Sequence, residues 1–170
     1  MNPIVSKSHL PPIMQQITNN TTSWIGQRPG ETKSRICGQT FICPAECDLG
    51  CIEIFSSYVN KNGSVELTIH QFDSNSKTWG PALAKSTIEF KRNETGSWVS
   101  FPVPGLHLSK NSSYGFRLQS DEVLAGLGEA AANYDHLPLI GGQEWVSSSD
   151  DQKGSYYSYL SLAFKVEMRA

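Results

Sequence analysis

The sequence predicts an all-β protein: an antiparallel β-sandwich of the jelly-roll type, preceded by an irregular N-terminal arm. Residues 160–168 alternate large apolar side chains with small or polar ones almost without error, which is the period of a strand buried on one face. Several earlier segments share this period, and no long stretch has the helical one. Turn residues separate these segments at regular intervals, as in β-sandwiches and barrels.

The chain of 170 residues is long enough for one domain with a proper core and too short for two comfortable ones. We expect residues 1–35 to form the arm, because prolines punctuate it, and residues 36–170 to form the sandwich. We interpret residues 13–17 as one turn of helix. The apolar pair Trp24 and Ile25 is expected to dock the arm on the sandwich, since leaving it in water is costly.

The expected strands follow one another through the sandwich. Asn62-Gly63 between two of them is a strong hairpin signal. Residues 102–105, with two prolines and a glycine, predict the end of one strand, and residues 73–76 (DSNS) predict the start of a long polar loop. The predicted strands are 35–42, 51–59, 64–72, 83–91, 97–103, 113–119, 125–132, 139–147 and 157–168.

The same alternation predicts which side chains form the core. His70 falls on the face opposite the apolar residues of its strand, so we expect it to face solvent. The predicted core residues are Val65, Leu67, Ile69, Ile88, Phe90, Val99, Phe101, Tyr114, Phe116, Leu118 and the apolar residues of 160–168.

Composition and charge exclude several classes of partner. Charged residues make up 18% of the chain, the formal net charge is −2, and no basic stripe is present, so we expect no nucleic-acid partner. No apolar run approaches the length of a membrane span. The first 12 residues lack the apolar centre of a signal peptide, which leaves open an intracellular location or a leader already removed.

A series of short motifs along the chain suggests a family. The motifs are GQTF at 38–41, GSVELTI at 63–69, PALA at 81–84, WVSF at 98–101, YGFRL at 114–118, GG at 141–142, Trp145 and LAFKV at 162–166. In this order they resemble bacterial jelly-roll modules of the galactose-binding-like, carbohydrate-binding type. The resemblance covers residues 36–168 and implies a non-catalytic binding or adhesion role in a secreted or cell-surface protein.

Four cysteines depart from that resemblance, because such modules usually need none at this place. Cys37, Cys43, Cys47 and Cys51 are spaced C-x5-C-x3-C-x3-C. Two local disulfides are one interpretation, with Cys37 and Cys51 facing each other across a strand pair and Cys43 and Cys47 closing the turn. A four-thiolate zinc or iron–sulfur site and buried free thiols are the alternatives, although the usual C-x2-C knuckle is missing.

The sequence contains no recognisable catalytic motif, so we expect a protein that is not an enzyme and needs no cofactor. Asp135 and His136 near Glu129 resemble a proton-transfer or metal pair, but a solvated surface is the simpler interpretation. The Asp150-Asp151 pair in a Ser/Asp/Gly loop could coordinate calcium, or it could be a flexible polar turn.

Aromatic residues provide better candidates for a ligand site, because their rings can stack on the apolar faces of sugars. We expect Trp79 to be exposed in the long polar loop, and Trp145, Tyr157 and Tyr159 to gather near the C-terminal loops. Burial of the tyrosines beneath the arm, together with Trp24, is the alternative.

These observations predict a non-catalytic module that binds carbohydrate or a surface glycan and serves in attachment. A structural or protein-interaction domain, with self-association as one form of that interaction, is the alternative function. Sugar binding predicts an exposed aromatic surface with Asn, Gln, Arg or Asp beside it, whereas an interface predicts a broader apolar patch.

Overall fold

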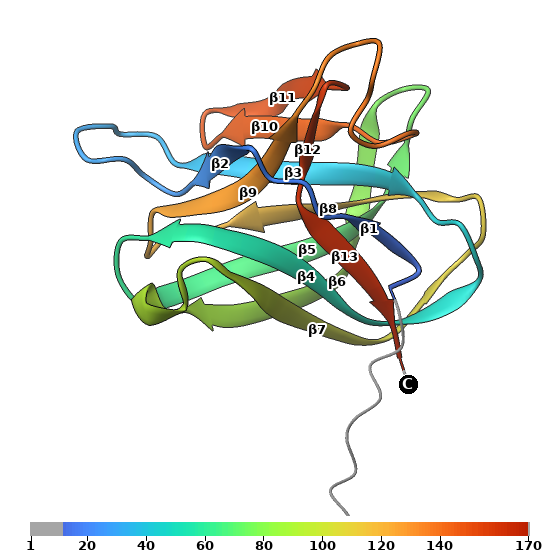
Figure 1. The fold of residues 1–170 in the computed structure, drawn as a ribbon, viewed down its shortest axis with the longest axis horizontal. Coiled ribbons are helices and arrows are strands. Elements are labelled where there is room, and N and C mark those ends of the chain that lie inside the picture. The colour runs from blue at the N-terminus through green and yellow to red at the C-terminus, as the bar shows by residue number, and fades with distance from the viewer. Residues whose placement is uncertain (1–11, 170) are drawn as a thin grey trace, which may run out of the picture.

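Alternating apolar residues on most strands meet between two antiparallel β-sheets, and the expected all-β antiparallel sandwich is confirmed (Figure 1). This computed structural model describes residues 12–169. The first sheet contains β1 (Met14–Gln16), β2 (Thr21–Ile25), β4 (Cys47–Val59), β7 (Ser97–Leu108), β9 (Ala125–Ala131), β12 (Leu160–Leu162) and β13 (Phe164–Met168).

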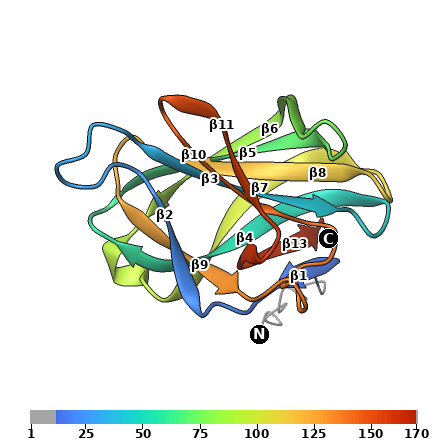
Figure 2. The ribbon, with the colours of Figure 1, turned by 90° about the horizontal axis from the view of Figure 1, so that it is seen from above.

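The second sheet has the strand order β11-β10-β3-β8-β5-β6. Its members are β3 (Arg35–Ile42), β5 (Gly63–Asp73), β6 (Thr78–Phe90), β8 (Ser113–Gln119), β10 (Glu144–Ser148) and β11 (Asp151–Tyr157). A 3-10 turn, η1 (Arg92–Glu94), joins β6 to β7. Figure 2 shows β5, β6 and β8 along one side of the molecule and β1, β2, β9 and β13 along the other.

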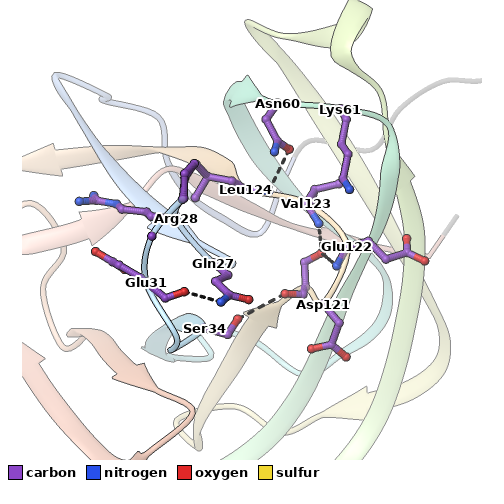
Figure 3. Close-up of a pocket in the computed structure, with 13 residues that line it drawn as sticks. Gln27, Arg28, Glu31, Ser34, Asn60, Lys61, Asp121, Glu122, Val123 and Leu124 are labelled. Atoms are coloured by element: carbon purple, nitrogen blue, oxygen red, sulfur yellow. Dashed lines mark hydrogen bonds between the residues drawn. The ribbon is translucent and has the colours of Figure 1, made fainter.

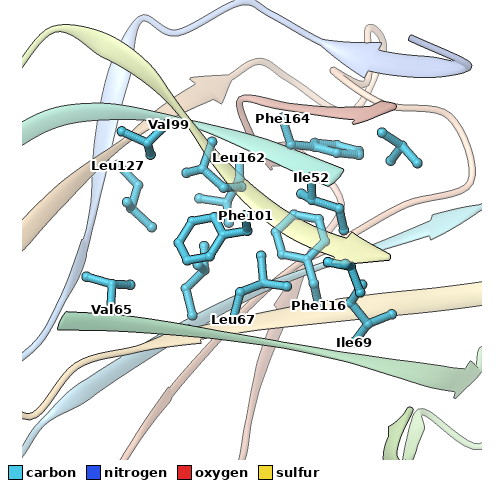
Figure 4. Close-up of a cluster of buried hydrophobic side chains, with 14 of the residues drawn as sticks. Ile52, Val65, Leu67, Ile69, Val99, Phe101, Phe116, Leu127, Leu162 and Phe164 are labelled. Atoms are coloured by element: carbon cyan, nitrogen blue, oxygen red, sulfur yellow. The ribbon is translucent and has the colours of Figure 1, made fainter. Parts of the chain in front are cut away.

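The core between the sheets contains the predicted side chains. Figure 4 shows Val65, Leu67 and Ile69 of β5 across from residues of the first sheet, with the ring of Phe101 between the layers. All but one of the individually predicted core residues are buried; Ile88 is only partly buried against the cluster. The apolar alternation therefore identified the inner face of each sheet correctly.

The expectation of an irregular arm is wrong for the part that the structure describes. Residues 14–16 form β1, which pairs with β13, and residues 21–25 form β2, which pairs with β9. Residues 13–17 therefore include a strand in place of a helical turn. Ile25 is completely buried, as docking requires. The first 11 residues of the predicted arm lie outside the described residues.

The predicted last strand, 157–168, is divided among three elements. The chain leaves the second sheet after β11, crosses to the first sheet as β12, and continues as β13 on a different neighbour. Between β12 and β13, the amide of Ala163 donates a hydrogen bond to the carbonyl oxygen of Gly128 at 2.8 Å. The alternation continues across this break because both strands turn the same face toward the core.

The Asn62-Gly63 signal marks a loop between the two sheets and no hairpin, because β4 and β5 belong to different sheets. The side-chain oxygen of Asn62 accepts a hydrogen bond from the Arg92 amide at 2.8 Å. A β-carbon on Gly63 would lie 2.5 Å from a methyl group of Val123, so close packing requires glycine there.

Two other turn predictions are corrected. Residues 74–77 form a tight hairpin where a long loop was expected, because the Asp73 carboxylate accepts hydrogen bonds from the next turn's amides at 2.9 and 3.2 Å. Strand β7 continues through Pro102 and Pro104 to Leu108. It pairs with β4 on one side only, and an edge strand tolerates prolines whose missing N–H would face solvent.

Candidate ligand-binding site

Trp79 and Trp145 belong to one cluster on the outer face of the second sheet, which we call the Arg117 cluster. The two indole rings lie 5.3 Å apart, and the Arg117 guanidinium carbon lies 4.3 Å from the Trp79 ring and 4.4 Å from the Trp145 ring. Six residues form it: His70, Phe72, Trp79, Arg117, Trp145 and Tyr156.

Glycines in the strands beneath allow the rings to lie close to the backbone. A β-carbon on Gly115 would lie 2.5 Å from the Trp79 ring, and one on Gly38 would lie 3.1 Å from the Trp145 ring. The indole nitrogen of Trp79 donates to the Tyr156 hydroxyl, and that of Trp145 donates to the carbonyl oxygen of Lys153, both at 2.9 Å. The outer face of this sheet therefore carries a second packed layer.

This layer corrects three expectations. Trp145 is 1% exposed, so its ring offers no open surface to a sugar. Trp79 lies in strand β6 and is half-buried, where an exposed loop position was expected. His70 is 8% exposed, because it bonds to Thr68 and to the Gly80 carbonyl oxygen and meets the edge of Trp79. Burial lowers its pKa.

The other two predicted residues, Tyr157 and Tyr159, lie half-buried in a separate group. Their rings are 5.8 Å apart, and the ring of Tyr134 lies 5.3 Å from that of Tyr159. Tyr134 is 76% exposed and belongs to the loop between β9 and β10, whose Ile140 is 88% exposed. Their ring contacts do not join them to Trp79 and Trp145 in one site within the described residues.

A cleft of about 590 Å³ lies at one end of the sandwich, between the loops that follow β2, β4 and β8 (Figure 3). We call it the loop cleft. It is lined mostly by polar and charged side chains, including Gln27, Arg28, Glu31, Ser34, Asn60, Lys61, Asp121 and Glu122. A cleft of this volume is large enough for a small ligand.

Hydrogen bonds between the loops hold the walls of this cleft. Ser120 accepts bonds from the amides of Glu122 and Val123 through its side-chain oxygen and donates to the Ser64 carbonyl oxygen at 2.7 Å. Asn60 accepts from the Leu124 amide at 3.0 Å. Gln27 donates to the Glu31 carbonyl oxygen within the loop that follows β2. The walls are therefore preorganised.

Several groups on these walls remain available to a ligand. Within residues 12–169, no hydrogen bond or ion pair engages the side chains of Lys61 and Asp121, and the side-chain nitrogen Nδ2 of Asn60 donates to no residue. Figure 3 shows Asn60 and Lys61 on one wall and Arg28 and Glu31 on the wall across from them. The cleft therefore contains hydrogen-bond donors and acceptors, and its charged side chains are of both signs.

An aromatic pair adjoins this cleft on the outer face of the first sheet. The rings of Trp24 and Tyr58 lie 5.6 Å apart, and the Arg28 guanidinium carbon lies 5.7 Å from the Trp24 ring. Tyr58 is 46% exposed, and Trp24 is half-buried. Because Arg28 also lines the cleft, it connects the aromatic pair to the polar walls.

Sequence reasoning missed Tyr58 as a site residue because alternation along β4 assigns it to the core. Ile52, Ile54 and Ser56 are buried at every second position. A register shift between Ser56 and Tyr58 then reverses the phase, so that Val59 points inward and Tyr58 outward. No signal in the sequence marks this bulge.

The four cysteines do not converge on one point. Cys37 lies on β3 of the second sheet, and Cys51 lies on β4 of the first, so the expectation that they face each other across a strand pair is wrong. All four are free thiols, and Cys43 contacts Cys47. Burial raises the pKa of Cys37 to about 12 and of Cys47 and Cys51 to about 11, which disfavours the thiolate that binds metals.

The structure brings together two carboxyl groups that the sequence analysis did not pair. Glu144 is completely buried on the inner face of β10, and neither of its side-chain oxygens accepts a hydrogen bond from a donor within residues 12–169. Burial, and then the adjacent Glu129, raises the pKa of Glu144 to about 10. The protonated form of Glu144 is therefore favoured at neutral pH, and this carboxyl group lies beside Glu129. The Glu129 carboxylate accepts a hydrogen bond from the Thr21 hydroxyl at 2.8 Å.

The aspartates considered for calcium are engaged in local bonds. Asp150 forms an ion pair with Lys33 and accepts from Ser148, while Asp151 accepts from the amides of Lys153 and Gly154. In the described range, no three His, Cys, Asp or Glu side chains are arranged to hold a metal ion. No helix among these residues is long and apolar enough to cross a membrane.

Comparisons with known proteins assign no family to this chain. No protein-family model matches it, and a search of curated proteins gives no significant match.

Proposed function

We propose that this protein is a non-catalytic module that binds carbohydrate in the loop cleft. The observation that supports this proposal most strongly is the exposed Tyr58 ring, packed against Trp24, beside a polar cleft of about 590 Å³. Sugars present apolar C–H faces that stack on aromatic rings and hydroxyl groups that need many donors and acceptors. The aromatic surface and the polar cleft meet at Arg28, which lies over the Trp24 ring and also lines the cleft.

Each element of this site has a distinct role in the proposed binding. Tyr58 supplies the stacking surface, and Trp24 supports it from the side. Asn60, Lys61 and Asp121 are available to bind hydroxyl groups. Because the loops are already hydrogen-bonded to one another, binding requires little ordering of the protein. Attachment to a glycan-bearing surface is the use that we infer for such a module.

A glycan array probed with and without calcium tests this function. We expect selective binding that does not depend on calcium and that weakens about tenfold or more, equivalent to ~1.4 kcal/mol, in Tyr58→Ala. Asn60→Asp retains the oxygen that accepts from the Leu124 amide and replaces the free donor with a charged acceptor, so it should also weaken binding without opening the loop.

Tyr134→Ala is the matched control, since it removes an exposed tyrosine far along the chain from the cleft. It should leave the array unchanged. A blank array under both conditions, or binding that is lost in Tyr134→Ala and retained in Tyr58→Ala, would overturn the proposal.

A protein-interaction role is the second candidate, and it depends on a different observation. Tyr134, Leu137 and Ile140 of the β9–β10 loop are 76%, 41% and 88% exposed, beside Tyr159. Exposed apolar side chains gathered in one loop are typical of a contact surface. Light scattering on the wild type and on Ile140→Ser tests self-association through this loop, which requires a mass above the monomer that falls in the variant.

A further inference from the structure

Arg117 has no counter-ion. Its guanidinium lies over the rings of both Trp79 and Trp145, yet no carboxylate within residues 12–169 forms an ion pair with it. Its Nε atom is buried without a hydrogen-bond partner. Burial lowers the pKa of this group, and only Tyr156 opposes that effect. A half-buried cation that is stacked and unpaired has its hydrogen-bonding edge free for an anion.

A cavity of about 430 Å³ adjoins this guanidinium. Its walls are Ile36, Arg117, Trp145 and the three consecutive serines 147–149. Ile36 and Ser147 are paired on β3 and β10, so they lie on the outer face of the sheet, as Arg117 and Trp145 do. The volume is that of a small-ligand site, and the serines supply hydroxyl groups around the cation.

Two carboxylates near this cavity already form ion pairs and hydrogen bonds with other residues. Glu66, on the same face of β5, pairs with Lys85 at 3.0 Å and accepts from Gln119 at 3.0 Å. Asp150, which follows the serines in the chain, pairs with Lys33 and accepts from Ser148. Neither carboxylate neutralises Arg117, so an added anion would meet an uncompensated positive charge.

We propose that this cavity binds the carboxylate group of an acidic saccharide, a uronic acid. The planar guanidinium fork matches a carboxylate with two parallel hydrogen bonds. The two indole rings orient the fork and limit its rotation, and the serine oxygens that line the cavity can accept hydrogen bonds from the hydroxyl groups of a sugar ring. The saccharide part of this inference rests on the proposed carbohydrate-binding function, whereas the anion part depends on Arg117 alone.

Nuclear magnetic resonance titration tests this site, because the Nε–H group of Arg117 and the indole N–H of Trp145 report on it directly. The probes are sodium glucuronate, its uncharged counterpart glucose, and sodium acetate. We expect glucuronate to shift both signals and to saturate in the millimolar range, with acetate binding about tenfold more weakly. Glucose is expected to leave the Arg117 signal in place.

Two substitutions at one position separate the anion site from the stability of the cluster. Ile36→Glu places a carboxylate beside the guanidinium and should weaken glucuronate binding at least about tenfold. Ile36→Gln has nearly the same size without the charge and should retain binding. Both variants leave the stack of Trp79, Arg117 and Trp145 intact, which an Arg117 substitution would not.

Three outcomes would overturn the inference: no shift of the Arg117 signal with glucuronate, equal affinity for acetate and glucuronate, or equal loss of binding in Ile36→Glu and Ile36→Gln. The variant Tyr58→Ala distinguishes this site from the loop cleft. It should weaken binding of neutral glycans about tenfold or more and leave the glucuronate shifts at Arg117 unchanged, so the failure of either proposal can be recognised separately.

Discussion

Two tryptophan groups built from the same parts lie on the outer faces of the two sheets. Trp24 packs against Tyr58 with Arg28 over its ring, and Trp145 packs against Trp79 with Arg117 over both. Each group lies over glycine, Gly126 in the first case and Gly115 with Gly38 in the second.

The two groups differ in what covers them. Tyr156 of β11 and Phe72 close to the β5–β6 hairpin enclose Trp145 and Trp79, whereas Tyr58 remains 46% exposed. Similar residue types therefore form covered aromatic rings in one place and an exposed aromatic ring in the other. The position of the neighbouring strands decides between these roles.

The comparison predicts its largest effect for truncation of the tryptophans. Trp145→Ala should lower the free energy of unfolding by about 3–5 kcal/mol, because it empties a completely buried site. Trp24→Ala should cost only about 1 kcal/mol, because its half-buried ring removes less apolar surface from water. Urea denaturation followed by circular dichroism measures both values. Equal losses in the two variants would contradict the distinction.

A smaller effect is expected from adding one methyl group beneath each tryptophan. Gly115→Ala would place a β-carbon 2.5 Å from the Trp79 ring, which His70, Phe72 and Tyr156 keep in place. It should destabilise the protein by about 1–3 kcal/mol. Gly126→Ala is the matched control, since its β-carbon would meet the exposed Thr22 at 2.8 Å and the Trp24 ring at 3.2 Å.

In Gly126→Ala, we expect a loss of less than about 1 kcal/mol, because an exposed side chain can move aside. Thermal unfolding of both variants provides the measurement. A larger loss in Gly126→Ala than in Gly115→Ala would show that the first group is the more rigid one.

The smallest expected effect concerns the inner face of β10, directly behind Trp145. The pKa of Glu144 is raised to about 10, so its contribution to stability is fully present below the unfolded pKa near 4.5 and is lost as the pH rises toward 10. Glu144→Gln removes this titration and retains a donor for Glu129. It should stabilise the protein at pH 8 and do so much less at pH 5, because only the wild type loses stability as the pH rises across this range.

Melting temperatures of Glu144→Gln and the wild type at pH 5, 7 and 9 measure this difference. A gap between the two proteins that stays constant with pH would mean that Glu144 is not held in its protonated form.

Much of the fold could be predicted because burial leaves a period in the sequence. Strands β3 and β8 begin and end as predicted, and residues 65, 67 and 69 are buried as the alternation indicated. The carbohydrate-binding function and the jelly-roll connectivity stay predictions. The resemblance to galactose-binding-like modules also stays a prediction, because no family model or curated protein bears on it.

The candidate site could not be predicted in the same way. Tyr58 faces solvent because a bulge in β4 reverses its phase, and Trp79 is covered because residues 74–77 close a tight hairpin. Trp145 was expected at a surface, but its ring lies between Arg117 and the glycines of neighbouring strands. Each of these outcomes depends on residues distant in the sequence.

The sequence by itself determined that this protein is an antiparallel β-sandwich and which faces of its central strands are buried. Local alternation and turn residues suffice for that, because the side chains of a strand necessarily point to opposite sides. Only the tertiary structure decided which aromatic rings are covered, which loops form the cleft, and that Arg117 lies over two tryptophan rings with no counter-ion among residues 12–169. These properties depend on the order and register of strands, which local patterns do not encode.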